Sequence, residues 1–347
     1  MRVLYVRIGS YLPELYAGAS LAMHGLLKAL QGRGHRVAVH CGSRRVEPDQ
    51  SVRDQTGDYV VVRAGAQAWP ASARRTIRRG KPDVVVTSQH GPWMERLAEH
   101  AADLPFVVYE HEISTAMYSP PRELRPRLRY VANSAVTAAH LKRTADLDAV
   151  VVPPIFGIPQ YAGQRSFGTK ALFVSMQVSK GADIVLQLAA ARPDVGFVIC
   201  ATWTQDLPGT NALRARAMTL ANVTLLPNQP GLGQLFGQTR VLLMPSRWEE
   251  AWGLTATEAQ VCGIPVLAST RGNLPETIGA GGVLLDPDGP IERWIEAFSR
   301  IVDDPATWSD LSRKALARGR AVLDQVEPAV DAFDQALHDA VGRRAVD

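Results

Sequence analysis

The sequence predicts an α/β protein built from two doubly wound parallel-sheet domains. Its 347 residues are more than one hydrophobic core normally organises, so two domains are expected. Short apolar runs, typical of buried parallel strands, alternate with helical patterns through both halves of the chain. Pro153-Pro154 and a stretch rich in Gly and turn residues interrupt this alternation near the middle.

The first half begins with the apolar run from Val3 to Ile8, which is followed by a Gly/Ala/Ser loop and a helical pattern from about Ser20 to Gln31. Gly32 and Gly34 end that helix. Further strands are expected at 36–40, 60–63, 84–87, 106–109, 130–133 and 150–152, with a helix at 134–143. We therefore predict an N-terminal Rossmann-like domain over 1–154 and a linker over 155–169.

The alternation restarts after the linker and predicts a second Rossmann-like domain over 170–325. Its strands are expected at 171–175, 196–201, 223–226, 241–244, 266–269 and 282–285. Its helices are expected at 181–191, 231–238, 290–303 and 305–323. Sheets of this kind bind ligands at the carboxyl ends of their strands, so the site is expected where those ends of the two domains face each other.

Composition narrows the class of protein. The chain starts directly with a strand-like run, so no signal peptide is expected. No segment approaches about 18 uninterrupted apolar residues, so no membrane span is expected. Cys41, Cys200 and Cys262 are isolated and odd in number, which favours buried thiols in a reduced compartment over zinc or disulfides. A cytoplasmic protein is predicted.

The net charge is only +4, but five cations crowd one helical segment. They are Arg74, Arg75, Arg78, Arg79 and Lys81. One interpretation is a solvated helix face, and the other is contact with an acidic acceptor or the inner, anionic membrane surface. No aromatic residues are interleaved with these arginines, so nucleic acid is not an expected partner.

The most informative stretch is 246–276, where two carboxylates flank a turn. Glu250 precedes Trp252-Gly253, and Glu258 lies in the short helical run that follows. The free N–H groups of a first helical turn bind phosphate, here at Gly253 and Leu254. A carboxylate accepts paired hydrogen bonds from a ribose or sugar diol. The pattern predicts a site for a phosphate-bearing, hydroxyl-rich ligand.

The context of this pair resembles the retaining family-4 glycosyltransferases with the GT-B fold. Pro245-Ser246 precedes it, Gly-Ile-Pro-Val follows at 263–266, and Leu-Pro-Glu stands at 274–276. The resemblance extends over nearly the whole chain and is strongest from 241 to 287. It implies two Rossmann-like domains facing across a cleft, with the last helix (326–347) packed back on the first domain.

The resemblance also implies roles for individual residues. Glu250 would lie beside the donor sugar, Glu258 would hold the nucleotide ribose, and Lys180 in Lys180-Gly181 would hold the donor phosphates. His111 occupies the place of a histidine that approaches the donor sugar. The usual glycine pair of the first strand-to-helix loop is reduced to Gly18, which is expected to approach phosphate or acceptor through its backbone.

Two positions depart from the family pattern. The arginine expected just after the first strand of the second domain is missing near Met176, and Arg247 and Arg271 are the local cations that could replace it. Asn273 stands where a second glycine usually precedes Leu-Pro-Glu. Asn accepts positive φ better than most residues, so the turn is expected to survive and to add an amide near donor or acceptor.

Candidates for the acceptor side lie in the first half of the chain. Glu110 and Glu112 flank His111, and either is expected to orient its ring or bind acceptor hydroxyls. His90 also follows a strand, and Trp93 nearby is a candidate platform for stacking a sugar.

The function predicted from these motifs is transfer of a sugar from a nucleotide-diphosphate sugar to a hydroxyl acceptor. The resemblance implies that the sugar is transferred with retention, by front-face attack. No Asp-x-Asp loop is evident and the family needs none, so no metal or other cofactor is expected. The acceptor remains open among small molecules, glycans and lipid-linked saccharides. Alternatives are another GT-B enzyme, such as a nucleotide-sugar epimerase or a non-glycosidic (pseudoglycosyl) transferase, and a non-catalytic nucleotide-sugar-binding protein.

Overall fold

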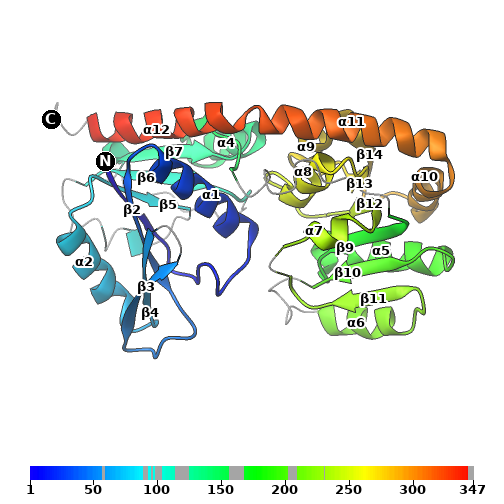
Figure 1. The fold of residues 1–347 in the computed structure, drawn as a ribbon, viewed down its shortest axis with the longest axis horizontal. Coiled ribbons are helices and arrows are strands. Elements are labelled where there is room, and N and C mark those ends of the chain that lie inside the picture. Colours follow the sequence, from blue (N-terminus) through cyan, green and yellow to red (C-terminus); the bar gives the residue numbers. More distant parts are fainter. Residues whose placement is uncertain are drawn as a thin grey trace. The chain divides into compact units, whose positions relative to one another are not determined.

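The computed structural model describes residues 1–56, 59–88, 93–94, 97, 104–113, 125–155, 168–201, 209–229 and 231–342 (Figure 1). The chain divides into two compact units. Unit 1 consists of residues 1–156 and 326–347, and unit 2 consists of residues 157–325. Of the predicted linker, residues 156–167 lie outside the described part of the chain.

Unit 1 contains an eight-stranded sheet with the order β3-β4-β2-β1-β5-β6-β7-β8. The strands are β1 (Arg2–Val6), β2 (Arg36–Gly42), β3 (Ser51–Thr56), β4 (Tyr59–Ala64), β5 (Val84–Thr87), β6 (Phe106–Glu110), β7 (Leu128–Ala132) and β8 (Ala149–Val151). All neighbours pair in parallel except β3 and β4, which pair antiparallel. The predicted doubly wound sheet is therefore confirmed, and the polar edge strand β3 is an addition to it.

The two faces of this sheet are covered by different helices. The helices are α1 (Gly18–Gly32), α2 (Trp69–Gly80), α4 (Ala135–Ala145) and α12 (Val326–Gly342). Because side chains alternate along a strand, Val3 and Tyr5 of β1 pack in one cluster with α1 and α12. Leu4 and Val6 pack in another cluster with α2. This alternation decides which residues beyond the strand ends share a face.

The last helix, α12, belongs to the core of unit 1. Val330, Phe333 and Leu337 are at most 1% exposed and lie in the cluster with α1 and β1. Phe333 contacts the ring of Tyr109 on β6, with 5.5 Å between ring centroids. Roughly 25 cal/mol per Å² of buried apolar surface makes such side chains a main source of stability. In Figure 1, α12 runs along the sheet beside β6 and β7.

Unit 2 contains a six-stranded parallel sheet with the order β11-β10-β9-β12-β13-β14. The strands are β9 (Lys170–Val174), β10 (Phe197–Cys200), β11 (Val223–Leu226), β12 (Thr239–Met244), β13 (Val266–Ser269) and β14 (Gly282–Leu285). The helices are α5 (Ala182–Ala191), α6 (Thr210–Met218), α7 (Gly233–Phe236), α8 (Leu254–Val261), α9 (Leu274–Ile278), α10 (Ile291–Asp303) and α11 (Pro305–Leu323). The strand order reverses at β9 and β12, which is where doubly wound sheets bind ligands.

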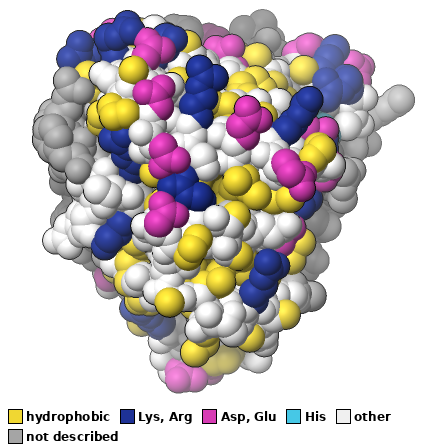
Figure 2. Space-filling view, turned by 90° about the vertical axis from the view of Figure 1, so that its right-hand side faces the viewer, with side chains coloured by type: hydrophobic (Ala, Val, Ile, Leu, Met, Phe, Trp, Pro, Cys, Tyr) yellow, Lys and Arg dark blue, Asp and Glu magenta, His cyan; other side chains and the backbone are white. Residues whose placement is uncertain are grey.

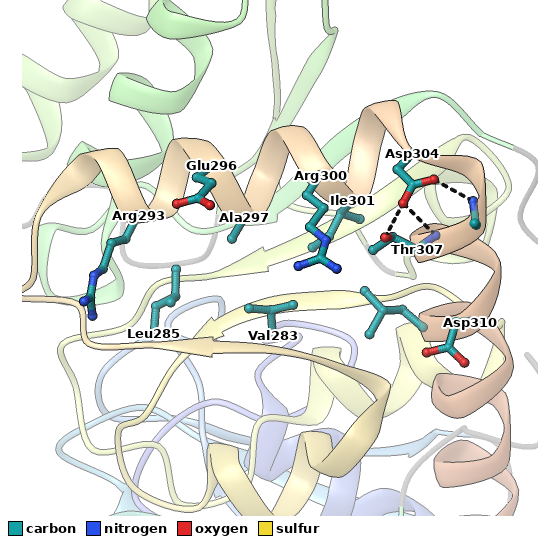
Figure 3. Close-up of a pocket in the computed structure, with 12 residues that line it drawn as sticks. Val283, Leu285, Arg293, Glu296, Ala297, Arg300, Ile301, Asp304, Thr307 and Asp310 are labelled. Atoms are coloured by element: carbon teal, nitrogen blue, oxygen red, sulfur yellow. Dashed lines mark hydrogen bonds between the residues drawn. The ribbon is translucent and has the colours of Figure 1, made fainter.

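A groove of about 670 Å³ lies between β14, α10 and α11 of unit 2. In Figure 3, Val283 and Leu285 form its floor, and Arg300 of α10 reaches over it. Asp304 caps α11 by accepting from the N–H groups of Ala306 and Thr307 at 3.0 and 3.2 Å. None of the predicted site residues lines this groove.

The charges on one face of the molecule are mixed in sign. Figure 2 shows basic and acidic side chains interspersed over that face, with apolar side chains between them. Nucleic-acid-binding surfaces typically carry a continuous basic patch, and the described side chains in this view form none.

Candidate active site

Three neighbouring strands of unit 2 bring the predicted donor-side residues together. β9, β12 and β13 are adjacent and parallel, so their carboxyl ends meet at one edge of the sheet. Lys180 follows β9, Glu250 and Gly253 follow β12, and Gly272 follows β13.

The segment after β9 packs directly on the segment after β12. Gly181 has φ +80°, and a Cβ there would lie 2.0 Å from the carbonyl oxygen of Pro245. The N–H groups of Arg247 and Trp248 both donate to the carbonyl of Ser179, at 2.8 and 2.9 Å. Only glycine allows this approach, and it brings Lys180 next to the carboxylate segment.

Lys180 and Glu250 form an ion pair with 2.7 Å between Nζ and Oε1. Their side chains are 29% and 14% exposed, so both can still be reached from solvent. The ammonium also lies 5.8 Å from the centre of the Trp248 ring. The fold thus places two of the predicted site residues in direct contact.

The backbone of Glu250 is fixed by the turn after β13. Asn273 N–H donates to the Glu250 carbonyl at 2.7 Å, and Gly272, at φ +59°, would place a Cβ 2.2 Å from that oxygen. Gly272 N–H also donates to the Glu249 carboxylate at 2.7 Å. The ends of three strands therefore meet around the Lys180–Glu250 pair.

Helix α8 begins at this same edge of the sheet. Gly253 precedes it with φ +95°, and Leu254 is its first residue. Among the described residues, no side chain caps this N-terminus and no acidic residue lies in its first turn. Its free N–H groups and the positive end of its dipole favour an anion. A Cβ at Gly253 would lie 2.8 Å from Cδ2 of Leu274.

Glu258 lies in the second turn of α8 and is only 9% exposed. Burial raises the pKa of this carboxyl to about 8. The pKa of the Cys262 thiol, one turn further on, is also raised, by burial and then by Glu258. Burial therefore favours the protonated form of Glu258 at neutral pH.

Both candidate replacements for the missing family arginine are engaged by carboxylates. Arg247 donates to Asp183 at 2.7 and 3.1 Å, and Asp183 holds its pKa above the usual value. Arg271 pairs with Asp288. Met176, beside the place of the missing arginine, is 4% exposed. The replacement of that arginine stays a prediction.

The prediction of positive φ at Asn273 is wrong. Asn273 has φ −86°, and the left-handed residue of this turn is Gly272. Asn273 is 2% exposed, and its amide donates to Thr277 Oγ1 at 3.0 Å. The added amide thus supports the turn from inside.

The acceptor-side candidates of unit 1 occupy different environments. His111 follows β6 and packs on Tyr109, with 4.1 Å between ring centroids. Glu110 is 6% exposed, whereas Glu112 is exposed. Trp93 packs edge to face on Trp69 at 5.5 Å. His90 lies outside the described residues.

Gly18 is the exposed first residue of α1, and its role stays a prediction. Arg7 falls within the predicted first strand, but it lies just beyond β1 and is only 8% exposed. An arginine at the end of an apolar run was the signal that could have singled it out, because buried arginines are rare.

Two absences hold for the described part of the chain. No group of three or more His, Cys, Asp or Glu side chains is placed to hold a metal ion there. No helix in it is long and apolar enough to span a bilayer.

Two protein families match consecutive parts of the sequence. Residues 16–155 match "Glycosyltransferase Family 4", and residues 168–318 match "Glycosyl transferases group 1". The chain therefore belongs to the family-4 type of glycosyltransferases with the GT-B fold.

Similar curated proteins are named D-inositol 3-phosphate glycosyltransferase. The protein from Pseudarthrobacter chlorophenolicus is 32% identical over 222 residues, which cover 55% of this chain and 51% of the relative. That from Arthrobacter sp. (strain FB24) is 31% identical over 251 residues, covering 62% and 59%. The chain thus spans about half the length of the curated relatives it matches.

Solved structures confirm the fold class. Sucrose-phosphate synthase from Thermosynechococcus elongatus has a TM-score of 0.78 at 16% identity, covering 97% of this chain and 98% of that one. Anabaena HepE in complex with UDP-glucose has a TM-score of 0.75 at 17% identity, covering 96% and 100%. At these identities the likeness concerns the fold alone.

Proposed function

We propose that the chain transfers a sugar, with retention, from a nucleotide-diphosphate sugar to a hydroxyl acceptor, without a metal. The observation that carries this proposal is the convergence of the Lys180–Glu250 pair, the open N-terminus of α8 and the buried Glu258 at three adjacent strand ends. Family membership supports it, and so does the binding of UDP-glucose by Anabaena HepE.

In this proposal Lys180 and the α8 N-terminus bind the donor diphosphate. Both are positive, and both stabilise the charge that develops on the leaving phosphate as the glycosidic bond breaks. The acceptor hydroxyl attacks on the face that the diphosphate leaves, and a phosphate oxygen takes its proton. Water must be excluded because it would compete with the acceptor for the donor.

The two glutamates have separate roles. Glu250, held by the turn at Gly272, orients donor sugar hydroxyls and releases Lys180 to the diphosphate. Glu258 binds the ribose diol, whose two hydroxyls donate to a carboxylate. The diol then supplies hydrogen bonds that favour the ionised form, which burial alone disfavours.

Thermal-shift measurements test which nucleotide sugar the chain binds. The ligands are UDP, GDP, ADP and dTDP, each alone and as the conjugate with glucose or a related sugar. A ligand at about 100 times its Kd stabilises the folded protein by about 2.7 kcal/mol. We expect only the nucleotides that carry one particular base to raise the melting temperature of the protein. We expect the Glu258→Ala substitution to abolish that rise. Glu296→Ala, an exposed glutamate of unit 2, serves as the matched control. A Glu258→Ala variant with undiminished donor affinity would contradict the proposal.

Turnover distinguishes this function from the alternatives that share the fold. NMR of the product shows its anomeric configuration, and the same configuration as in the donor sugar would indicate retention. An epimerised donor without acceptor would indicate an epimerase, a product lacking a glycosidic bond would indicate a pseudoglycosyl transferase, and donor binding without turnover would indicate a binding protein.

The basic helix α2 is proposed as a peripheral contact to anionic membranes. Its cations Arg78 and Arg79 lie in the last turn, and Arg75 is also exposed. Co-sedimentation with vesicles of anionic and of neutral lipid tests it. Replacing Arg75, Arg78 and Arg79 by Gln should abolish anionic-vesicle binding, and equal binding by both proteins would refute the contact.

A further inference from the structure

A chain of buried hydrogen bonds in unit 2 links the turn before α9 to the start of α8. The side-chain amide of Asn273 donates to Thr277 Oγ1 at 3.0 Å. The hydroxyl of Thr277 donates to the Trp252 carbonyl at 2.5 Å, and the Trp252 indole donates to Thr257 Oγ1 at 3.0 Å. These side chains are at most 8% exposed, so the bonds form in a low-dielectric interior where they are strong.

The direction of the first two bonds follows from the groups that make them. A hydroxyl carries one proton, and the Thr277 proton goes to the Trp252 carbonyl. The Thr277 oxygen is then an acceptor for the amide of Asn273, which must present its nitrogen. Loss of the Thr277 hydroxyl would leave a buried amide and a buried carbonyl without this partner, which is costly.

Helix α9, which carries Thr277, is itself held by two other helices. The guanidinium of Arg318 on α11 donates to the carbonyls of Glu276 and Thr277 at 2.8 and 3.1 Å. The amide of Gln260 on α8 donates to the Ile278 carbonyl at 2.8 Å. The last turn of this short helix is therefore a fixed support.

This support carries the segment from Glu250 to Gly253 along its length. The N–H of Asn273 donates to the Glu250 carbonyl at 2.7 Å. At the other end, a Cβ on Gly253 would lie 3.9 Å from Cγ2 of Thr277. The hydroxyl of Thr277 holds the Trp252 carbonyl between these two points. The path of the segment is thus set by one short helix and the turn before it.

The helix that follows this segment has an anchor of its own. Helix α8 packs on α11 so closely that a Cβ on Gly319 would lie 2.7 Å from the backbone of Val261. Loss of the Thr277 hydroxyl therefore releases the peptide groups between Glu250 and Gly253 and leaves α8 in place.

We propose that Thr277 and Asn273 are positioning residues for the sugar of the donor, and that they control its affinity separately from that of the nucleotide. The inference rests on the function proposed above, in which Glu250 binds sugar hydroxyls and α8 binds the diphosphate and the ribose. Thr277 and Asn273 act through the backbone of the segment from Glu250 to Gly253.

Two substitutions separate the hydroxyl of Thr277 from its packing. Thr277→Val keeps the shape of the side chain and removes the hydrogen bond, whereas Thr277→Ser keeps the hydroxyl and removes a methyl group. Thr239→Val is the matched control. Thr239 is 2% exposed, and its hydroxyl donates to the Leu235 carbonyl at 2.7 Å, at the amino end of β12 and away from the site.

Calorimetric titration with UDP, GDP, ADP and dTDP, and with the glucose conjugate of each, gives the two affinities to be compared. For the nucleotide that the protein binds, Thr277→Val should weaken the conjugate about threefold to tenfold, the range for one lost hydrogen bond. The affinity for the bare diphosphate should not change. Thr277→Ser should restore the conjugate, and Thr239→Val should alter neither ligand. Equal weakening of conjugate and diphosphate, or undiminished affinity for the conjugate, would overturn the inference.

Turnover adds a readout that a loss of stability does not change. Release of diphosphate from saturating conjugate, measured well below the melting temperature of every variant, gives kcat for folded protein. Thr277→Val should lower kcat about tenfold or more, because a displaced sugar leaves the reactive geometry, and Thr277→Ser should restore it. If Thr277→Val does not fold, Asn273→Ala should weaken the conjugate relative to the diphosphate, since φ −86° suits alanine. An unchanged ratio of the two affinities there would also overturn the inference.

The outcomes separate this inference from the proposed function. Sugar transfer by the unmodified protein, with unchanged kcat and conjugate affinity in Thr277→Val, would keep the function and remove the positioning role. A conjugate affinity that depends on the Thr277 hydroxyl, in a protein that transfers no sugar, would keep the positioning role and remove the transferase function. An unmodified protein that binds none of the conjugates would overturn both.

Discussion

Glu258→Gln should stabilise the ligand-free protein in a pH-dependent way. The folded carboxyl has a pKa of about 8, raised from 4.5 by burial. Between these values the folded chain keeps a proton that the unfolded chain has lost, so stability falls as pH rises. At about 1.4 kcal/mol per pH unit, this costs about 3 kcal/mol at pH 7. Glutamine resembles the protonated acid and does not titrate, so the variant does not lose this stability as the pH rises.

Calorimetric melting of the full chain at several pH values measures this effect. For a unit of this size 1 kcal/mol corresponds to about 2–4 °C, so the transition of unit 2 should rise by roughly 6–12 °C at pH 7 in Glu258→Gln. The difference should vanish near pH 4.5 and level off above about pH 8. Glu296→Gln, on the exposed side of α10, should show no such trend.

The result that would refute this reasoning is a difference in melting temperature that stays constant from pH 4.5 to pH 8. It would mean that Glu258 is already ionised in the folded protein. A second readout follows from the proposed ribose role, because a diol that favours the ionised form must release a proton on binding. Titration of the nucleotide at pH 7 in buffers of different ionisation enthalpy should reveal that release.

Three further predictions concern the same edge of the sheet. Gly181→Ala should lower the free energy of unfolding of unit 2 by more than about 2 kcal/mol, because its Cβ would lie 2.0 Å from the Pro245 carbonyl oxygen. The loss would be seen as a lower melting temperature, and an unchanged melting temperature would refute the close packing. Lys180→Gln should lower kcat by about 10²–10³, the range for removing one group that stabilises developing charge, whereas a change in KM alone would assign Lys180 to ground-state binding. EDTA should leave turnover unchanged, and activity restored only by added Mg²⁺ or Mn²⁺ would contradict the metal-free mechanism.

The fold was predictable because the apolar patterns of the strands and helices end where Gly, Pro and other turn residues occur in the sequence. The run at 266–269 became β13, and the helix after Gly253 became α8. β3 was missed because its sequence, Ser-Val-Arg-Asp-Gln-Thr, is polar, as suits an edge strand. α6 was missed because its residues Thr210–Met218 show no clear apolar stripe.

The order of the strands predicts which residues meet at the edge of the sheet in unit 2, but not their ionisation or their contacts. Proximity of Lys180 and Glu250 followed from their strand ends, but the pKa of Glu258 depends on burial by residues distant in sequence. The turn at Gly272 depends on its contact with Glu250. Arg7 was read as a strand residue because its hydrogen bond to Ser20 spans the β1–α1 loop. Such features need coordinates, because they arise from packing between segments.

Lys180, Arg247 and Arg271 are all paired with carboxylates, so the proposed binding of a diphosphate would require an exchange of partners. Lys180 must leave Glu250, and Arg247 must leave Asp183 if it replaces the missing family arginine. Asp183→Asn removes that competitor. It should then tighten the binding of the nucleoside diphosphate several-fold and leave the binding of the bare nucleoside unchanged, since only the diphosphate gains from a freed guanidinium.

Calorimetric titration of both ligands measures this difference, with Asp194→Asn as the control because Asp194 pairs with Arg192, elsewhere in unit 2. Asp183 lies in the first turn of α5, so its replacement also removes a favourable interaction with the helix dipole, worth about 0.3–1 kcal/mol of stability. That loss affects melting and not the difference between the two ligands. Equal effects on nucleoside and diphosphate, or none, would show that Arg247 stays with its carboxylates when donor binds, and Arg271 would then be the cation to test in the same way.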